Sequence, residues 1–317
     1  MSPSDLTSSL RSSWNRIHRI ALPASGALRR AGRGPLQWKQ VDKRRMCPQC
    51  RAFITTSDRI CPYCDTAVGP RAIDRLNPGG VLAGFIPHAR FVTVMILTIN
   101  VGLYLVTMLF SMRAGFDAMM DIDGRTLFIF GAKHREAIFL GQWWRLVTAG
   151  FLHGGLFHIL MNSWVLFDLG AQVEEIYGQK RLIVIYFVST VAGFFASALW
   201  TPALSIGASA GVFGLIGAMI ALGAKSSTAL GAAIKAHYLR WAVYGLLMGF
   251  LPFFRADNAA HLGGLAAGFG CAWIAGIPRL LPDDWRERIW TALTVVALAL
   301  TALSFLLMFL WFTGVSK

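Results

Sequence analysis

Apolar residues gather into blocks of about 20 along the last two thirds of the chain, and short polar stretches separate them. A helix needs a run of about that length to cross the hydrocarbon core of a bilayer. Charged residues are absent from the centres of the blocks, and Asp168 and Arg240 lie near predicted ends. The pattern predicts an all-α polytopic membrane protein with seven spans, at residues 91–112, 154–170, 182–200, 208–224, 239–255, 259–276 and 289–313.

Composition and charge agree with a membrane protein that has a small polar head. The 317 residues are 55% hydrophobic and only 15% charged, which is too apolar for a soluble protein of this size. The net charge of +14 invites a nucleic-acid interpretation, but half of the 30 Lys and Arg residues lie in residues 1–90. Most of the other Lys and Arg residues fall in loops predicted on the same side of the membrane as the N-terminus. This distribution follows the positive-inside rule of membrane proteins. We therefore expect a cytoplasmic N-terminus, attraction to anionic lipid and no nucleic-acid partner.

The segments around the spans set the expected domain boundaries. Residues 1–45 lack the apolar run of a signal peptide and are interpreted as a flexible basic arm, with an organelle-targeting peptide as the alternative. Residues 69–90 link the head to a six-span core at 91–276, and residues 277–317 hold a linker and the seventh span. We expect a bacterial inner membrane rather than an organelle.

Four of the five cysteines form two CxxC pairs, Cys47–Cys50 and Cys61–Cys64, separated by ten residues. This spacing suits tetrahedral coordination of a structural zinc ion. Residues 46–68 are too few to fold on a hydrophobic core, so metal binding would supply folding energy. Iron and two disulfides are the alternatives, and a reducing cytoplasm opposes disulfides. The pattern resembles a minimal zinc ribbon, a docking element whose partner is unknown, while Cys271 is interpreted as core packing.

Polar side chains inside the apolar blocks are costly, so each is a candidate for function. They form three clusters: His153 to Asn162 in the second block, Gly207 to Gly211 at the start of the fourth, and Ala259 to Gly264 at the start of the sixth. A chain that enters from inside begins all its even-numbered spans at the outer surface. The three clusters therefore fall at one depth, and we expect one site.

Helical geometry sorts the residues of the second block. At about 100° per residue, His158 and Asn162 are about 40° apart and share a face. His153 lies about 140° from His158 and is expected to point elsewhere. A metal site built on these two histidines is disfavoured, because helical zinc pairs use a spacing of four.

Ser209 and His261 are each ambiguous alone. Ser209 opens a helix, where the helix dipole favours negative charge, but an N-capping serine would suit the same position. His261 could be a structural hydrogen-bonding residue. Gly264 and Gly268 share its side of the helix, and this small face would let the fourth span approach, with Gly211, Gly214 and Gly217 as its partner face. Serine and histidine at hydrogen-bond distance are the minimum for nucleophilic catalysis.

No carboxylate shares this depth, so we expect a dyad. Asp257 lies one turn before His261, and its alternatives are an orienting acid or a helix cap.

The combined motifs resemble those of the rhomboid intramembrane proteases, over residues 85–276. The matching elements are Trp144-Arg145, the HxxxxHxxxN run that ends at Asn162, GASA around Ser209 and AHLGG around His261. The resemblance implies Ser209 as nucleophile and His261 as base and then acid, with no catalytic cofactor. It implies an oxyanion hole from His158, Asn162 and the Ser209 amide. It also implies supporting roles for five residues: His153, Gly207, Phe213, Trp144 and Arg145.

The resemblance further implies that the substrates are transmembrane proteins cut near the outer end of a span, with the fifth span and the loop 252–258 as gate and cap. The chain departs from the family in Ala210, where glycine usually follows the nucleophile, and in the extra seventh span, which we expect to be peripheral to catalysis. The alternatives are an inactive rhomboid-like protein that binds transmembrane clients, and a histidine-containing transporter or channel.

Overall fold

The computed structural model describes residues 44–47, 49–55, 58–68, 90–251, 256–276 and 284–314. The chain divides into two compact units between Asn77 and Pro78, and each is described by itself. Most of the predicted arm and linkers, and residues 252–255 of the predicted cap, lie outside the described residues.

The N-terminal unit is built around one short antiparallel pair of strands, β1 (Arg44–Met46) and β2 (Phe53–Thr55). The first CxxC pair lies between these strands and the second follows β2. Cys47 and Cys61 are buried together with Ile54 and Val68. This core is far too small to stabilise a domain by burial alone.

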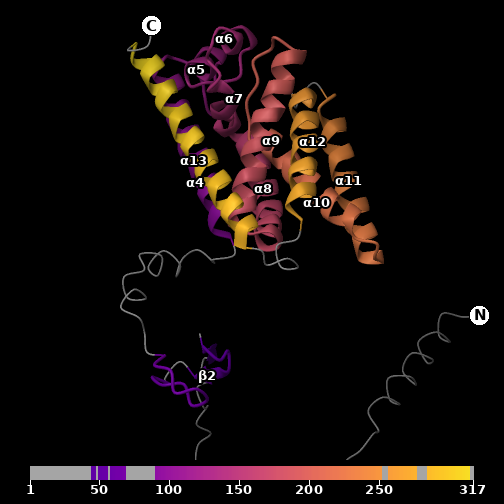
Figure 1. Ribbon diagram of the computed structural model, residues 1–317. Coiled ribbons are helices and arrows are strands. Elements are labelled where there is room, and N and C mark those ends of the chain that lie inside the picture. Colours follow the sequence, from indigo (N-terminus) through magenta and orange to yellow (C-terminus); the bar gives the residue numbers. More distant parts are fainter. Residues whose placement is uncertain are drawn as a thin grey trace, which may run out of the picture. The chain divides into compact units, whose positions relative to one another are not determined.

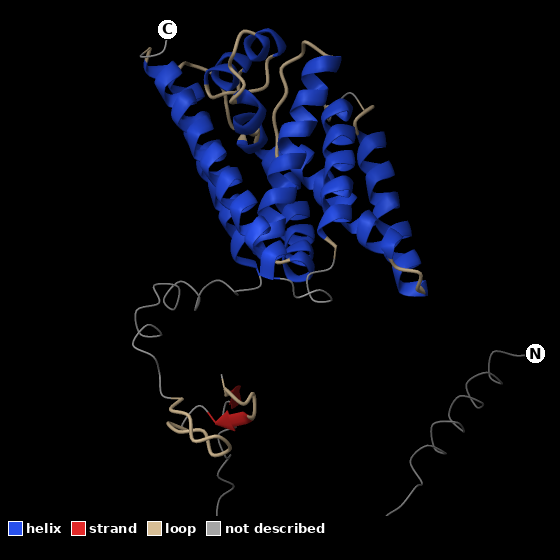
Figure 2. Ribbon diagram, in the orientation of Figure 1, coloured by secondary structure: helices blue, strands red, loops and turns tan. Residues whose placement is uncertain are grey.

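The second unit is an all-α bundle, as predicted (Figures 1 and 2). Its long helices are α4 (Phe91–Arg113), α8 (Leu156–Tyr177), α9 (Gln179–Trp200), α10 (Ser209–Lys225), α11 (Ala229–Met248), α12 (Asn258–Ala275) and α13 (Asp284–Thr313). Among the described residues, α4, α8, α9 and α13 are long and apolar enough to cross a membrane. The chain is an integral multi-pass membrane protein.

Helix α10 is short because it occupies the centre of the bundle. Most of its 17 residues are buried against α9, α11 and α12. A helix enclosed by other helices does not need the long apolar side chains of a lipid-facing span. Its glycine and alanine residues instead allow close packing.

Two spans differ most from their predicted bounds. The fifth was predicted at 239–255, but α11 begins at Ala229 and ends at Met248. The prediction began too late because Lys235 and His237 lower the hydropathy of the first half of the helix. The helix is capped by Thr228, whose hydroxyl accepts from Gly231 N–H at 3.1 Å. Helix α8 continues to Tyr177, so Asp168 lies inside the helix and accepts from the Gln172 amide at 2.9 Å.

The long connection between α4 and α8 folds into four short helices that the hydropathy pattern did not predict. They are α5 (Gly124–Ile129), α6 (Arg135–Phe139), α7 (Arg145–Thr148) and the 3-10 turn η2 (Ala149–Phe151). In Figure 1, α5, α6 and α7 gather at the end of the bundle where α12 begins. This connection, residues 114–155, is called the first loop below.

Candidate active site

Ser209 is the first residue of α10, and a glycine places it there. Gly207 has a φ of +123°, which side-chain-bearing residues rarely adopt. A Cβ at this position would also lie 2.8 Å from Nε2 of His158. The residue before the helix is Ala208, which has no capping side chain. Ser209 is therefore not the N-cap, and its hydroxyl is available for other contacts.

The first loop fixes the segment that leads into Ser209. Lys133 is fully buried, and its ammonium donates to the carbonyl oxygens of Thr201 at 2.6 Å and Ala203 at 2.9 Å. Its backbone pairs with Ser205 in both directions, and Gly207 N–H donates to Ala149 O at 2.9 Å. The sequence analysis missed Lys133. In the sequence, Lys133 is only a lysine between apolar stretches, and solvated lysines commonly occur in such positions.

His261 faces Ser209 from α12. Its Nε2 lies 2.9 Å from the Ser209 hydroxyl oxygen, while Nδ1 is buried and has no hydrogen-bond partner among the residues that the structure describes. Asp257 caps α12 by accepting from Ala260 N–H at 3.0 Å, and its other oxygen accepts from the Ser197 hydroxyl. The capping interpretation of Asp257 is thus the one observed, and the carboxylate does not contact the imidazole.

Glycines bring α10 and α12 together, as predicted. A Cβ at Gly264 would lie 2.1 Å from the Ala210 carbonyl oxygen, and one at Gly268 would lie 2.0 Å from that of Gly214. Backbone therefore touches backbone at both positions. The assignment of Gly211 to this face was wrong, because a Cβ there would meet Tyr186 of α9 at 2.5 Å. Gly214 faces both neighbours, because a Cβ there would lie 2.0 Å from the Ser189 hydroxyl oxygen on α9 and 3.2 Å from the Gly264 carbonyl oxygen on α12. Gly211 lies about 60° around the helix from Gly214 and faces α9.

Ala210, which stands where the family usually has glycine, packs against Gly193 of α9. A Cβ at Gly193 would lie 2.9 Å from the Ala210 methyl carbon and 2.6 Å from the Ala260 carbonyl oxygen. The methyl group therefore occupies space that Gly193 leaves open. Nothing in the order of residues along the chain paired these two positions.

The predicted oxyanion residues lie along the start of α8. His158 Nδ1 accepts from Gly154 N–H at 3.3 Å, which leaves Nε2 directed towards Gly207. The Asn162 amide donates to His158 O at 3.0 Å. The predicted separation of His153 and His158 was wrong, because their rings lie 5.2 Å apart. Helix α8 begins only at Leu156, so a helical angle does not apply to His153, which is fully buried.

Trp144 and Arg145 organise the first loop. The Arg145 guanidinium is fully buried and donates to Phe128 O at 2.7 Å, Ala132 O at 3.0 Å and the Gln142 side chain at 2.6 Å. Burial lowers the pKa of this guanidinium to about 10. It also lies 4.6 Å from the Trp144 ring and 5.1 Å from the ring of Trp311 on α13. The seventh helix therefore contacts the first loop, and its expected separation from catalysis stays a prediction.

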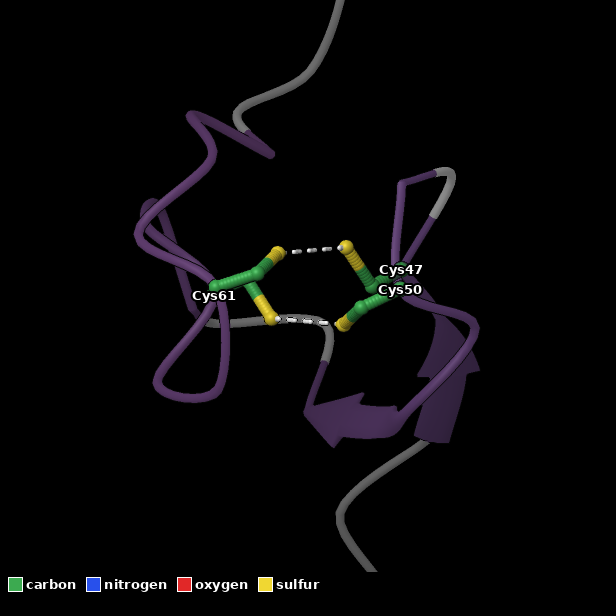
Figure 3. Close-up of side chains that lie close together, drawn as sticks. Cys47, Cys50 and Cys61 are labelled. Carbon is green, nitrogen blue, oxygen red and sulfur yellow. Dashed lines mark hydrogen bonds between the residues drawn. The ribbon is translucent and has the colours of Figure 1, made fainter.

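The four head cysteines form a cluster of free thiols. Their sulfur atoms all lie within 4.8 Å of one another, and the pairs Cys47–Cys64 and Cys50–Cys61 are each 3.6 Å apart. Figure 3 labels Cys47, Cys50 and Cys61 of this cluster. Hydrogen bonding to Thr66, whose hydroxyl lies 3.3 Å away, lowers the pKa of the Cys64 thiol to about 6. A cluster of four thiols with one already acidic can hold a metal ion.

Comparison with known proteins agrees with the sequence motifs. The family model for the rhomboid domain matches residues 140–278. Rhomboid-like protease 2 of Toxoplasma gondii is 30% identical over 236 residues, covering 70% of this chain and 79% of the relative. Rhomboid protease GluP of Bacillus subtilis is 33% identical over 186 residues, covering 57% of this chain. The chain matches only 36% of the Bacillus protein's length.

One similar plant protein carries a name that denotes no activity. Inactive RHOMBOID-like protein 8 of Arabidopsis thaliana is 38% identical over 124 residues, covering 38% of this chain and 35% of the relative. Membership of the family therefore does not decide catalytic activity. On the shared domain, the helical bundle and the extent of these matches, the chain belongs to the rhomboid family.

Proposed function

We propose that this protein is an intramembrane serine endopeptidase that hydrolyses peptide bonds in or near the transmembrane segments of other membrane proteins. The observation that carries the proposal is the 2.9 Å distance between the Ser209 hydroxyl and Nε2 of His261. A serine hydroxyl is a weak nucleophile until a base at this distance takes its proton. Ser209 and His261 both lie in the first turn of their helices, α10 and α12.

The reaction begins with attack of Ser209 Oγ on the scissile carbonyl carbon while His261 Nε2 accepts the hydroxyl proton. The tetrahedral intermediate then collapses, and the same imidazole gives the proton to the leaving amine. His261 then takes a proton from a water molecule as the water attacks the acyl-enzyme. It returns a proton to the Ser209 oxygen as the acid product leaves. In the part of the chain that the structure describes, the imidazole Nδ1 has no acceptor, so packing rather than a third catalytic residue orients the ring.

Negative charge on the substrate oxygen would be stabilised at the N-terminus of α10. The Ser209 backbone amide belongs to the first turn, where amides lack partners within the helix and the dipole is positive. His158 Nε2 is the nearest side-chain donor to Gly207, and Asn162 lies one turn further along α8. Donors of this kind contribute about 10²–10³ in rate where they have been removed one at a time.

The test is cleavage of a reporter membrane protein by the purified enzyme in lipid vesicles. Ser209→Ala is expected to abolish cleavage while the melting temperature stays within a few degrees of wild type. Ser205→Ala is the matched control, because this serine precedes α10 in the same segment and lies outside the dyad. Unchanged cleavage by Ser209→Ala would reject the assignment.

The alternative within the family is an inactive protein that binds transmembrane clients. It predicts that folded wild-type protein fails to react with a fluorophosphonate, whereas the protease labels at Ser209 and the Ser209→Ala variant does not. The 2.9 Å distance between His261 Nε2 and the Ser209 hydroxyl favours the protease.

The head and the location complete the proposal. We propose that Cys47, Cys50, Cys61 and Cys64 hold a structural zinc ion, supported by the four converging thiols. The distribution of basic residues supports a cytoplasmic N-terminus, and we propose a bacterial inner membrane as the location.

A further inference from the structure

The C-terminal end of α13 packs on the first loop. Helix α13 contributes little to the core, since only 11% of its most apolar stretch is buried inside the protein. In Figure 1 the end of the helix lies beside α5. Three aromatic pairs join its last turns to the loop, with ring centroids 5.4–6.1 Å apart: Phe305–Phe151, Trp311–Phe128 and Phe312–Phe130. The end of a peripheral helix is therefore attached to the loop that precedes the site.

Trp311 covers a buried cation. The guanidinium carbon of Arg145 lies 4.1 Å from the centre of the Phe128 ring, 4.6 Å from that of Trp144 and 5.1 Å from that of Trp311. Phe128 and Trp144 belong to the first loop, whereas Trp311 comes from α13. No carboxylate pairs with Arg145 among the described residues, and its Nη2 has no hydrogen-bond partner there. Ring faces and carbonyl oxygens therefore compensate this charge.

Two short routes lead from Arg145 to the segment before the nucleophile. Arg145 donates to Ala132 O, and the residue after Ala132 pairs with Ser205 through both of its backbone groups, at 2.9 Å and 3.2 Å. Helix α7 begins at Arg145, and Ala149 directly after this helix accepts from Gly207 N–H at 2.9 Å. The segment that leads into α10 is thus held at two points by a loop that Arg145 organises.

We propose that Trp311 is a positioning residue of the active site, an inference that rests on the proposed proteolysis. By covering Arg145, it holds the first loop, and the loop holds Ser209 at hydrogen-bond distance from His261. Helix α13 then takes part in catalysis, although the resemblance to the family implies a peripheral helix. A purely structural role for Trp311 predicts a lower melting temperature and an unchanged kcat for the molecules that remain folded.

The test is cleavage of a reporter membrane protein by the purified full-length enzyme in lipid vesicles. The number of active sites is counted by labelling with a fluorophosphonate to completion. Trp311→Leu keeps an apolar side chain and removes the ring. We expect kcat per labelled site to fall about 10- to 100-fold with little change in KM, since misplacing a catalytic group by about 1 Å costs up to about 10² in rate. An unchanged kcat with a lower melting temperature would overturn the proposal.

Two further variants show whether the ring face itself matters. Trp311→Phe retains an aromatic face for the guanidinium and is expected to recover most of kcat. Trp285→Leu is the matched control, because it removes a tryptophan from the other end of α13, where the ring centre lies 5.5 Å from the Arg286 guanidinium. It is expected to leave kcat unchanged. Equal losses in Trp311→Leu and Trp285→Leu would overturn a specific role for Trp311.

A double variant tests whether Trp311 acts through Arg145. Arg145→Lys keeps the positive charge but loses the flat guanidinium that stacks on the rings. If the two residues act as one unit, adding Trp311→Leu to Arg145→Lys should lower kcat little further. Losses that multiply would show that the two residues act independently, which contradicts the proposal.

Hydrogen exchange tests the proposal without any catalysis. We expect amides of residues 201–209 to exchange about tenfold faster in Trp311→Leu than in wild type, the factor that the loss of a buried cation–π contact supports, and Trp285→Leu to match wild type. Faster exchange in a protein that neither cleaves nor labels would reject the protease and keep the coupling between Trp311 and this segment. Unchanged exchange in Trp311→Leu would overturn the coupling whatever the activity.

Discussion

Phe213 stacks on His261, with ring centroids 4.1 Å apart and planes only 7° from parallel. Phe213 lies one turn after Ser209 on α10, so the helix that supplies the nucleophile also holds the base. Nδ1 has no hydrogen-bond partner within the described ranges, so the stacking on Phe213 is an observed contact that holds the plane of the ring.

We therefore expect Phe213→Leu to lower kcat/KM about tenfold with little loss of expression. A favourable aromatic pair contributes about 0.5–1.5 kcal/mol, and 1.4 kcal/mol corresponds to a factor of ten. The measurement is steady-state cleavage of a reporter substrate. Phe269→Leu is the control, because that ring stacks on Trp273 further along α12. A comparable loss in both variants would indicate general damage to the bundle.

Contact between α10 and α12 leaves no room for a methyl group at Gly268. We expect Gly268→Ala to destabilise the bundle by about 1–3 kcal/mol, the usual cost of overpacking, and to reduce cleavage by separating Ser209 from His261. Thermal unfolding in detergent and the cleavage assay measure the two effects.

Gly270→Ala provides a control on the same helix, because a Cβ at Gly270 has no atom within 4 Å. It is expected to be neutral or slightly stabilising, since alanine is the better helix former by about 1 kcal/mol. If Gly268→Ala matched Gly270→Ala in both assays, the close approach of the two helices would be wrong.

Ala210 tests whether the departure from the family pattern affects the chemistry. Its methyl group packs at Gly193, so Ala210→Gly is expected to keep cleavage within a few-fold of wild type and to cost about 1 kcal/mol of stability. Gly193→Ala is expected to be far more damaging, because its Cβ would meet both the methyl group and a backbone carbonyl. A large gain in cleavage by Ala210→Gly would show instead that the methyl group obstructs the site.

Site residues that follow local patterns could be predicted from the sequence. Residues that act through contacts with distant parts of the chain could not. Apolar blocks and helix-start parity are local patterns, and they were enough to place Ser209 and His261 at one depth. Lys133 acts on carbonyls 68 and 70 residues away, so no local pattern identifies it. The proximity of His153 to His158 was missed because the chain before Leu156 is not helical.

Lys133 holds the segment before the nucleophile, and we expect it to act as a positioning residue. Lys133→Met leaves the carbonyl groups of Thr201 and Ala203 without their donor, at a cost of about 2 kcal/mol in unfolding free energy. It should lower kcat more than it raises KM, because Ser209 loses its position rather than its substrate. Lys133→Arg should restore part of kcat, and Arg135→Met serves as the charge control in the same loop. Loss of stability with an unchanged kcat would limit Lys133 to a structural role.

The cysteine cluster predicts that all four thiolates are needed to hold the metal ion in the head. Elemental analysis of purified protein should find about one zinc per chain, and Cys61→Ser should lose it, whereas Cys271→Ser on α12 should keep it. Because the pKa of the Cys64 thiol is already near 6, its thiolate is present at pH 7 without metal. Protons compete for this ligand as pH falls below that value, so the metal should be retained at neutral pH and released on acidification. Zinc retained in Cys61→Ser would contradict the four-thiolate site, and iron in its place would change the identity of the ion.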